Sequence, residues 1–345
     1  MRIVVDAMGG DHGCGVIVDG VYRALDEQPQ IQSATVVGRL AEIRPHLRPG
    51  DPYRLDVLHA DEVLTMEDKP IDGVRRKKNC SIARGIELLR DQEADVFVSP
   101  GNTGGVVTVA TIRLGRLPGV DRPGIATVIP TPNREFVLLD SGANIDCKPI
   151  HLAHYAIMGS IFAEEILGHD RPKVGLLSVG TEETKGNELT LETFKLCRQL
   201  DLNFVGNVEG HDLFNDKVDV VVCDGFVGNV VLKTCESLAK GLFGWLKREL
   251  TANPIRSLAA MLARGGLRKI KNRMDPDAYG GAPLLGLNGD VVIAHGSAQS
   301  HSIQNAIRMT TETFTHKINA RIVAEVARAN EILDPTPPHA IDNTR

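Results

Sequence analysis

Residue types that mark several large functional classes are scarce in this 345-residue chain. Aromatic residues make up only 4%, too few for the stacking surfaces that bind nucleobases. Lysine and arginine (39) are outnumbered by aspartate and glutamate (44), and the net charge of −5 argues against a dedicated nucleic-acid-binding protein. The six cysteines are scattered without a CxxC pair, which argues against a zinc site or a dithiol redox centre.

Signals for membrane insertion and export are also missing from the sequence. No stretch approaches the roughly 18 consecutive apolar residues of a membrane-spanning helix. The first residues, MRIVVDAMGGDH, contain only a short apolar run before Asp6, unlike a signal peptide. With 42% hydrophobic and 24% charged residues, the sequence predicts a globular cytoplasmic protein.

The familiar nucleotide-binding and hydrolase motifs are absent. The sequence contains no GxxxxGK[ST] phosphate loop, no GxSxG nucleophile turn and no HExxH metal motif. The nearest approach to GxGxxG, at residues 13–18, lacks the third glycine, so we discount a dinucleotide fingerprint. His151 and His154 fall on an expected helix without nearby carboxylate ligands, and we interpret them as structural rather than metal-binding.

Short β-branched runs alternate with glycine-containing turns and helix-period stretches along the chain. Nearly continuous apolar runs are typical of strands that are covered on both faces, as in parallel sheets with helical crossovers. The runs are IVVD (3–6), TVVG (35–38), VFVS (96–99), VLLD (137–140), VGLLSVG (174–180), DVVVCD (219–224) and VVIAHG (291–296). We therefore predict a three-layer α/β/α sandwich with a mostly parallel sheet.

Neither an internal repeat nor a low-complexity linker divides the chain. We expect a single α/β domain over residues 1–330, with a projecting helical hairpin at about 240–275. The Pro-containing residues 331–345 are expected to form a frayed tail.

Six turns that directly follow expected strands consist mainly of Gly, Asn, Ser, Thr and Asp. In open α/β sheets ligands bind beyond the carboxyl ends of the strands, so these turns are where a site is expected. Glycine lets a backbone approach a ligand closely, and the free N–H groups at a helix start favour an anion. The turns are 6–12, 99–105, 140–148, 178–188, 223–229 and 294–298. Together they predict a crevice for small anionic or polar groups.

Two of these turns are candidates for holding a phosphate group. After VFVS, the amides of the GNTGG turn (101–105) and the Thr103 hydroxyl suit an anion. Capping of the next helix by Asn102 or Thr103 is the alternative. A later turn supplies a cation and an amide, Lys185 and Asn187. A solvated surface lysine is the alternative for Lys185.

Aspartates and histidines at strand ends provide further candidates. Asp6, Asp140 and Asp224 each end an apolar strand, a position where capping is the common role. Because a carboxylate repels phosphate, we expect these aspartates to orient Lys185, His12 or His295 instead. His12 and His295 also follow strand ends, where a neutral imidazole can donate to a phosphate or a thiolate. A structural or solvated histidine is the alternative.

Eight segments occur together and in an order typical of one family of bacterial enzymes. They span residues 1 to about 315 and are VDAMGGDH, SPGNTGG, LLDSGANIDCKP, GTEETKGNEL, NFVGNVEGHDL, VVCDGFVGNVVLK, YGGAPLLG and AHGSA. On these segments the sequence resembles the acyl-carrier-protein:phosphate acyltransferases of phospholipid synthesis. The resemblance implies transfer of a long-chain acyl group from acyl carrier protein to inorganic phosphate, and use of the acyl phosphate by a membrane glycerol-3-phosphate acyltransferase. It also implies a homodimer with a fold similar to phosphotransacetylases and the isocitrate/isopropylmalate dehydrogenase group.

The implied reaction requires neither a cofactor nor a metal ion, because phosphate is itself a nucleophile at neutral pH. The protein must supply position, a donor for the developing oxyanion and exclusion of water. We expect the phosphate ligands to be Asn102, Thr103, Gly104, Lys185 and Asn187. Asn229 or His295 would then polarise the thioester carbonyl or protonate the departing thiolate, with His12 as a further proton donor.

A basic segment at residues 247–273 holds eight Lys/Arg residues and one acidic residue in a chain of net negative charge. Ile255, Leu258 and Leu262 share one helical face within it. A basic amphipathic helix can lie on an anionic membrane surface, and we expect peripheral membrane contact here. A dimer interface or a core-packed helix is the alternative.

Three other functions remain open from the sequence alone. One is a phosphotransacetylase that uses short acyl-CoA, with the same phosphate chemistry and a different thiol carrier. Another is a decarboxylating dehydrogenase on a similar fold, which needs a divalent metal and NAD(P). A scaffold that only docks acyl carrier protein is the third, although it leaves the six polar turns without a purpose.

The densest basic run, Arg75, Arg76, Lys77 and Lys78, is either a solvated loop or a docking patch for an acidic carrier protein. If it is a docking patch, Arg75→Glu together with Arg76→Glu should slow the use of acyl carrier protein and flatten the dependence of kcat/KM on salt. Initial rates at several ionic strengths measure both effects. Unchanged rates at every ionic strength would assign the run to the solvated loop.

Overall fold

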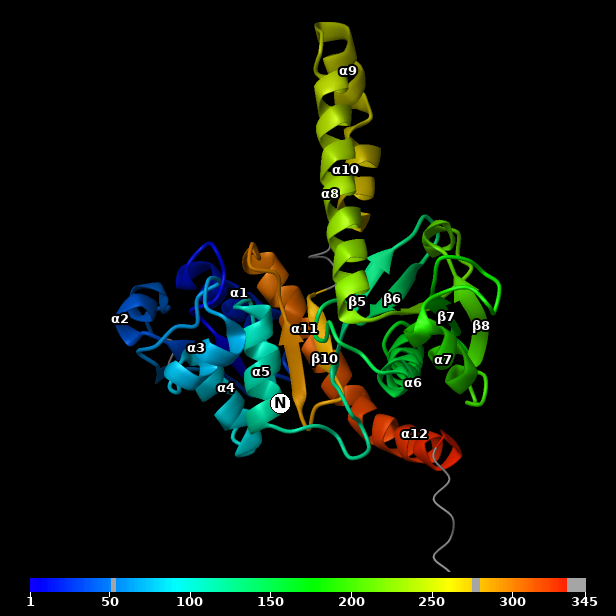
Figure 1. Cartoon of the computed structure of the whole chain (residues 1–345). Coiled ribbons are helices and arrows are strands. Elements are labelled where there is room, and N and C mark those ends of the chain that lie inside the picture. The colour runs from blue at the N-terminus through cyan, green and yellow to red at the C-terminus, as the bar shows by residue number, and fades with distance from the viewer. Residues whose placement is uncertain (51–53, 275–279, 334–345) are drawn as a thin grey trace, which may run out of the picture.

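The central sheet changes strand direction near its middle. The computed structural model describes residues 1–50, 54–274 and 280–333. Within them the strand order is β3-β2-β1-β4-β11-β10-β5-β6-β9-β7-β8 (Figure 1). Strands on the β3 to β11 side are parallel to one another, as are those on the β6 to β8 side. Antiparallel pairing of β10 and β5 joins the two groups. The predicted mostly parallel sheet with flanking helices is confirmed.

Short strands and longer helices alternate along the chain, as the sequence predicts. The strands are β1 (Arg2–Asp6), β2 (Ser33–Gly38), β3 (Leu55–His59), β4 (Val96–Ser99), β5 (Gly124–Pro130), β6 (Glu135–Leu139), β7 (Lys173–Leu177), β8 (Asn203–Val208), β9 (Val220–Val222), β10 (Ala282–Leu285) and β11 (Asp290–Ile293). The helices are α1 (Cys14–Glu27), α2 (Leu40–Ile43), η1 (Arg44–His46), α3 (Pro70–Arg76), α4 (Ser81–Arg90), α5 (Thr103–Arg113), α6 (Pro149–Glu165), α7 (Glu188–Cys197), η2 (Gly210–Phe214), α8 (Gly225–Leu250), α9 (Pro254–Leu262), α10 (Arg264–Arg273), α11 (Ser300–His316) and α12 (Ile318–Leu333).

Strand side chains are buried on both faces of the sheet, which explains the continuous apolar runs. In β1, Ile3 and Val5 pack in the cluster formed with α1 and α11. Val4, between them, points to the opposite face and packs with α4 and α5. In the other half, Val137 of β6 faces α6, whereas its neighbour Leu138 packs with η2 and the base of α8. The period-2 alternation of a strand thus places an apolar residue on each covered face.

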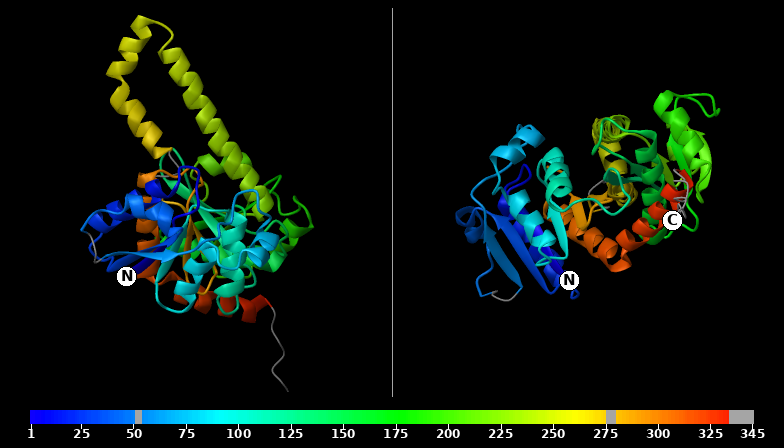
Figure 2. Two further views of the ribbon diagram at one scale, coloured as in Figure 1. Left: turned by 90° about the vertical axis from the view of Figure 1, so that its left-hand side faces the viewer. Right: turned by 60° about the horizontal axis from the view of Figure 1, so that its bottom comes forward.

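Helices α11 and α12 connect the two halves of the molecule. Helix α11 packs against α1 and α12 packs against α6, and Figure 2 shows the pair running beneath both halves. Helix α12 continues to Leu333, so residues 331–333 of the expected tail are helical. The rest of that tail, residues 334–345, lies outside the described residues. The single-domain division over residues 1–330 stays a prediction.

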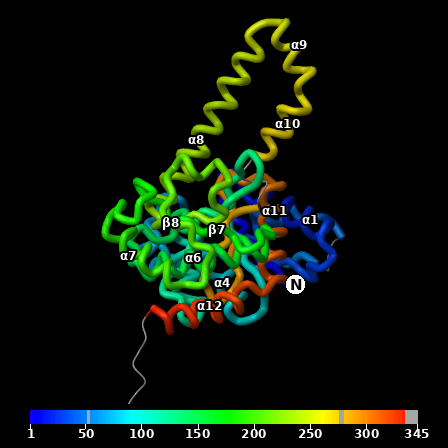
Figure 3. The backbone as a smooth tube through the Cα atoms, turned by 90° about the vertical axis from the view of Figure 1, so that its right-hand side faces the viewer, coloured from blue at the N-terminus to red at the C-terminus, as the bar shows by residue number. Residues whose placement is uncertain are grey.

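A helical hairpin projects from the body, as Figure 3 shows, and it begins earlier than the sequence predicts. Its first leg is α8, which starts at Gly225 rather than near residue 240. Asp224 caps this helix, and no proline interrupts the 26 residues that follow. At about 1.5 Å per residue, α8 is about 39 Å long. None of the helices in the described ranges is long and apolar enough to cross a membrane.

The turn after β1 packs directly on the turn after β4, so Gly9→Ala should destabilise the protein. A Cβ atom at Gly9 would lie 2.4 Å from the Gly101 nitrogen and 2.9 Å from the Pro100 carbonyl carbon. Since backbone cannot yield as a side chain does, we expect a loss of about 1–3 kcal/mol in the free energy of unfolding. Chemical denaturation measures it. Gly241→Ala in α8, where a Cβ meets nothing within 4 Å, is the control and should be neutral or slightly stabilising.

Candidate active site

Four of the six polar turns meet around one cavity of about 340 Å³. Its wall includes residues from the turns after β4, β6, β9 and β11, namely Thr103, Gly104, Ser141, Gly142, Asn229 and His295. Strand pairing explains the convergence: Ile293 pairs with Ala282 in β10 and Leu139 pairs with Ala126 in β5. Because β10 and β5 pair with each other, the ends of β11 and β6 reach the same level of the sheet from opposite halves. The cavity therefore lies where strand direction changes, the usual ligand position in open α/β sheets.

The N-terminus of α5 gives the cavity its anion-binding character. The first N–H groups of a helix have no partner within that helix and carry partial positive charge, and Thr103 and Gly104 occupy these positions at the cavity wall. Asn102 has a different role from the one expected. Its side-chain oxygen accepts the Gly105 N–H at 2.9 Å, while its amide donates to the Thr65 carbonyl at 2.9 Å. Asn102 is thus committed to capping α5, which leaves backbone groups and the Thr103 hydroxyl of this turn for a phosphate.

A lysine that the sequence analysis missed lies at the cavity. Lys233 Nζ is 2.9 Å from Glu236 Oε2 and 3.4 Å from His295 Nε2. The opposite nitrogen of His295, Nδ1, is 2.7 Å from the Ser297 hydroxyl. Asn229 and Lys233 are four residues apart on α8 and therefore share a helix face. The spacing was visible in the segment VVCDGFVGNVVLK, but it becomes informative only once the helix is known to start at Gly225.

Lys185 and Asn187 do not line this cavity. Lys185 is solvent-exposed, and Asn187 caps α7 by accepting the Thr190 N–H at 3.0 Å. Their turn follows β7, which is separated from β6 by β9 in the sheet, so it emerges away from the central strands. The structure therefore brings Thr103, Gly104, Asn229 and His295 together and leaves Lys185 and Asn187 outside the group. Their expected role in phosphate binding stays a prediction.

The strand-end aspartates orient loop backbone rather than basic side chains, contrary to expectation. Asp6 is fully buried and accepts the Ser99 hydroxyl at 2.7 Å and the Met8 N–H at 3.0 Å. Burial raises the pKa of the Asp6 carboxyl, and these hydrogen bonds oppose that rise. Asp224 accepts two N–H groups at the start of α8, both at 3.0 Å, as a helix cap does.

Asp140 fixes the turn after β6 in the same way. It is fully buried and accepts N–H groups from both the neighbouring strand and its own turn. Burial raises the pKa of its carboxyl, opposed by these backbone hydrogen bonds. The donors are Ile125 (3.0 Å), Gly142 (3.1 Å), Ala143 (2.9 Å) and Asn144 (2.8 Å). Ser141 and Gly142 are thereby held at the cavity wall.

The remaining candidate histidines lie elsewhere. His12 lines a different hollow, beside Cys14 and His46 at the start of α1. His151 Nδ1 accepts the Lys148 N–H at 3.0 Å, and His154 Nε2 lies 2.9 Å from the Asn330 side-chain oxygen. Both of these helix histidines are buried, which agrees with their structural interpretation. Among the residues that the structure describes, no group of three or more His, Cys, Asp or Glu side chains is placed to hold a metal ion.

The cysteines are unsuited to covalent catalysis. Burial raises the pKa of all six thiols, including Cys147, whose pKa rises to about 11 beside the Asp140 turn. A nucleophilic cysteine requires a thiolate at neutral pH, and a raised pKa disfavours that form. None of the six cysteines lines the central cavity, so a covalent role for them there is not supported by the structure.

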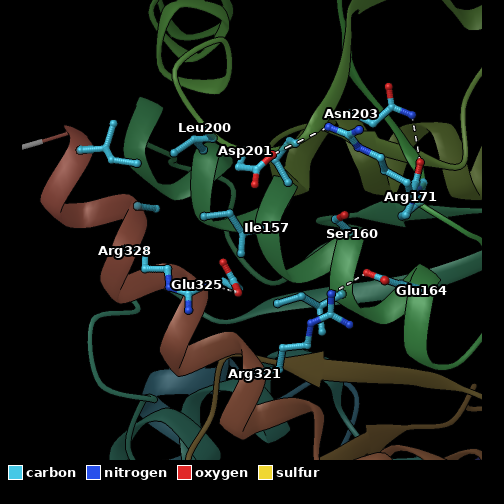
Figure 4. Close-up of a pocket in the computed structure, with 15 residues that line it drawn as sticks. Ile157, Ser160, Glu164, Arg171, Leu200, Asp201, Asn203, Arg321, Glu325 and Arg328 are labelled. Carbon is cyan, nitrogen blue, oxygen red and sulfur yellow. Dashed lines mark hydrogen bonds and ion pairs between the residues drawn. The ribbon is translucent and has the colours of Figure 1, made fainter.

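A larger hollow of about 620 Å³ lies between α6 and α12, and Figure 4 shows it. Its arginines already have acidic partners within the hollow. Arg321 is 2.6 Å from Glu164, Arg328 is 2.9 Å from Glu325, and Arg171 is 3.9 Å from Asp201. Because these charges balance one another, this hollow is less suited to a phosphate than the central cavity.

Fold and cavity together define an α/β enzyme that handles a small anion. Similar solved structures include a phosphotransacetylase from Streptococcus pyogenes, with a TM-score of 0.58 and 17% identity over 96% of this chain and 94% of that one. A branched-chain phosphotransacylase from Enterococcus faecalis has a TM-score of 0.57 and 16% identity over 92% and 100% of the two chains. At such identities the likeness establishes the fold alone.

The chain belongs to the phosphate acyltransferase family of enzymes. The family model described as "Fatty acid synthesis protein" matches residues 1–321. The phosphate acyltransferase of Desulfitobacterium hafniense is 49% identical over 330 residues, which cover 95% of this chain and 98% of that protein. The phosphate acyltransferase of Bacillus subtilis is 44% identical over 328 residues, covering 94% and 98%.

The position of Lys233 distinguishes it from Lys185. If the cavity holds phosphate, Lys233→Met should raise the KM for phosphate about tenfold to a hundredfold, the equivalent of losing one charged hydrogen bond. Lys185→Met, matched in shape, should change it much less. Initial rates over a phosphate series measure both. The opposite ranking, with Lys185→Met the more damaging, would move the phosphate to the turn after β7.

Proposed function

We propose that this protein transfers a long-chain fatty acyl group from acyl carrier protein to inorganic phosphate, releasing acyl phosphate for phospholipid synthesis. The observation that carries the proposal is the central cavity, where the α5 N-terminus, Lys233 and His295 surround a space of about 340 Å³. Membership of the phosphate acyltransferase family supports the same chemistry. Neither a metal ion nor a cofactor has a part in the proposed step.

Phosphate is the nucleophile in this mechanism. The N–H groups of Thr103 and Gly104 and the ammonium of Lys233 hold it beside the thioester. A phosphate oxygen attacks the carbonyl carbon, and the Asn229 amide donates to the oxyanion that forms. The carbon–sulfur bond then breaks, and the proton lost by the attacking hydrogen phosphate passes through His295 to the departing thiolate. The products are acyl phosphate and the free thiol of the carrier.

Carrier docking is proposed at the basic run next to the cavity. Lys77 is committed to the structure, because it pairs with Asp68 and donates to the Val63 carbonyl at 2.8 Å. Arg75, Arg76 and Lys78 are solvent-exposed. They lie at the end of α3 and just beyond it, and the first residue of α3, Pro70, is packed so closely on Gly104 that a Cβ there would be 2.5 Å from its ring. An acidic carrier at this patch would therefore stand beside the cavity wall.

Membrane contact is proposed at the end of the hairpin. Ile255, Leu258 and Leu262 of α9 are 82%, 56% and 81% exposed, and basic residues flank them. Such a helix suits the anionic inner face of a cell membrane, where a membrane glycerol-3-phosphate acyltransferase would receive the product.

We also propose a homodimer. Exposed Leu242 and Trp245 on the other face of α8 are candidates for its interface.

The function is tested by trapping acyl phosphate with hydroxylamine. Palmitoyl-acyl carrier protein and palmitoyl-CoA are compared as donors, each with and without inorganic phosphate. We expect phosphate-dependent hydroxamate from the carrier protein. Product from the CoA ester alone would instead indicate a phosphotransacetylase, and no product from either donor would contradict the proposal.

The membrane role is tested by flotation with liposomes that contain anionic lipid. Leu258→Glu places a charge in the exposed apolar face of α9 and should reduce the bound fraction severalfold, because a buried charge opposes insertion. Ile112→Glu, at an exposed apolar residue of α5 outside the hairpin, is the matched control and should leave the bound fraction unchanged. Equal flotation of Leu258→Glu and the unaltered protein would remove α9 from the membrane surface.

A further inference from the structure

One face of α8 continues from the central cavity into the hairpin. Near the base of the helix, Asn229, Leu232 and Glu236 line the cavity. Seven-residue steps keep positions near one helix face. From Glu236 such steps reach Phe243 and Leu250, and from Leu232 they reach Ala239 and Leu246. On this face Leu232, Glu236, Ala239, Phe243 and Leu250 are partly buried, and Leu246 is exposed. Another face of α8 carries the exposed residues Leu238, Leu242 and Trp245.

One leg of the hairpin, α8, contributes to the cavity. Besides the α8 residues, Gly281 and Ala282, which follow the second leg in sequence, line the cavity. The cavity thus lies at the base of α8, the first leg of the hairpin. In Figure 2 the legs stand apart over much of their length, and Figure 3 shows the same separation.

A groove lies between the legs farther along the same face of α8. It has a volume of about 470 Å³, and Phe243, Leu246 and Leu250 of α8 form one wall. Ala260 of α9 and Leu267 of α10 lie on the opposite side. At about 1.5 Å per residue, the distance along α8 from Leu232 to Leu246 is about 21 Å, comparable with an extended long-chain acyl group.

We infer that this face of α8 is the binding path for the fatty acyl chain, with its carbonyl end in the cavity and its methyl end in the groove between the hairpin legs. The inference rests on the proposed function, because it places the phosphate at the cavity end. Three observations carry it: the continuity of the helix face, the position of the cavity at the base of α8, and the match between groove distance and chain length. Each methylene withdrawn from water strengthens binding by a factor of about four, which gives such a path selectivity for long chains.

The test is the chain-length profile of Ala239→Phe in an assay without lipid. Ala239 lies on the inner face between cavity and groove, so a phenyl group there blocks the path beyond the first few carbons. The ratio of kcat/KM for palmitoyl- over hexanoyl-acyl carrier protein should fall at least tenfold, with hexanoyl activity within about twofold of the unaltered protein. Leu246→Ser, which makes the groove wall polar, should shift the ratio in the same direction. Ser237→Phe, at an exposed position on the opposite face of α8, is the control and should leave the ratio unchanged.

The possible outcomes distinguish a failure of the proposed acyl-chain path from a failure of the proposed acyltransferase function. Unchanged ratios in both inner-face variants, while the unaltered protein makes acyl phosphate from both donors, would overturn the path and leave the function standing. Equal losses with both donors, accompanied by a changed oligomeric state in light scattering, would make this face a contact between copies and also overturn the path. If the unaltered protein makes no acyl phosphate from either donor, the proposed function fails and the path fails with it.

Discussion

The Asp140 carboxylate is closed off from water and accepts four backbone N–H groups, so the turn after β6 cannot move without uncovering a buried acid. Asp6 imposes a similar constraint on the other half of the sheet through Ser99, and the glycines of its turn let two loops pack backbone against backbone. These two buried acids fix the cavity walls from opposite sides. The site depends on them although neither carboxylate needs to touch a substrate, because a wall anchored through backbone groups is already in place before any ligand arrives.

The chemistry that such a cavity permits follows from the groups on its wall. Backbone N–H groups at the start of α5 and the ammonium of Lys233 suit catalysis by positioning and charge. The Lys233–Glu236 pair keeps an ammonium in place while limiting its net charge, which suits a phosphate that must leave again as part of the product. His295, held by Ser297 on one nitrogen, presents the other toward Lys233.

Much of the fold could be predicted from the sequence because apolar runs such as IVVD and VLLD report burial on both faces, a local property of each strand. The candidate site was predictable only in part, because the order of strands in the sheet is not local. Lys185 and Thr103 occupy similar turns in the sequence, yet β7 lies outside the central strands whereas β4 borders β11. Asn102 fitted both phosphate binding and helix capping until its three hydrogen-bond partners, in Gly105, Thr65 and Asp68, could be placed. The place of Lys233 at the cavity could not be predicted, because it depends on where α8 begins.

A single uninterrupted helix carries catalytic-site residues at one end and leads to the exposed apolar tip at the other. Helix α8 is about 39 Å long, and the Asp224 cap fixes its first turn to the body of the protein. A small tilt imposed on the far end by a surface turns Asn229 and Lys233 together, since they sit on the first turns of the same rod. A displacement of the hairpin tip is therefore transmitted to the cavity wall, because no break in α8 separates the two.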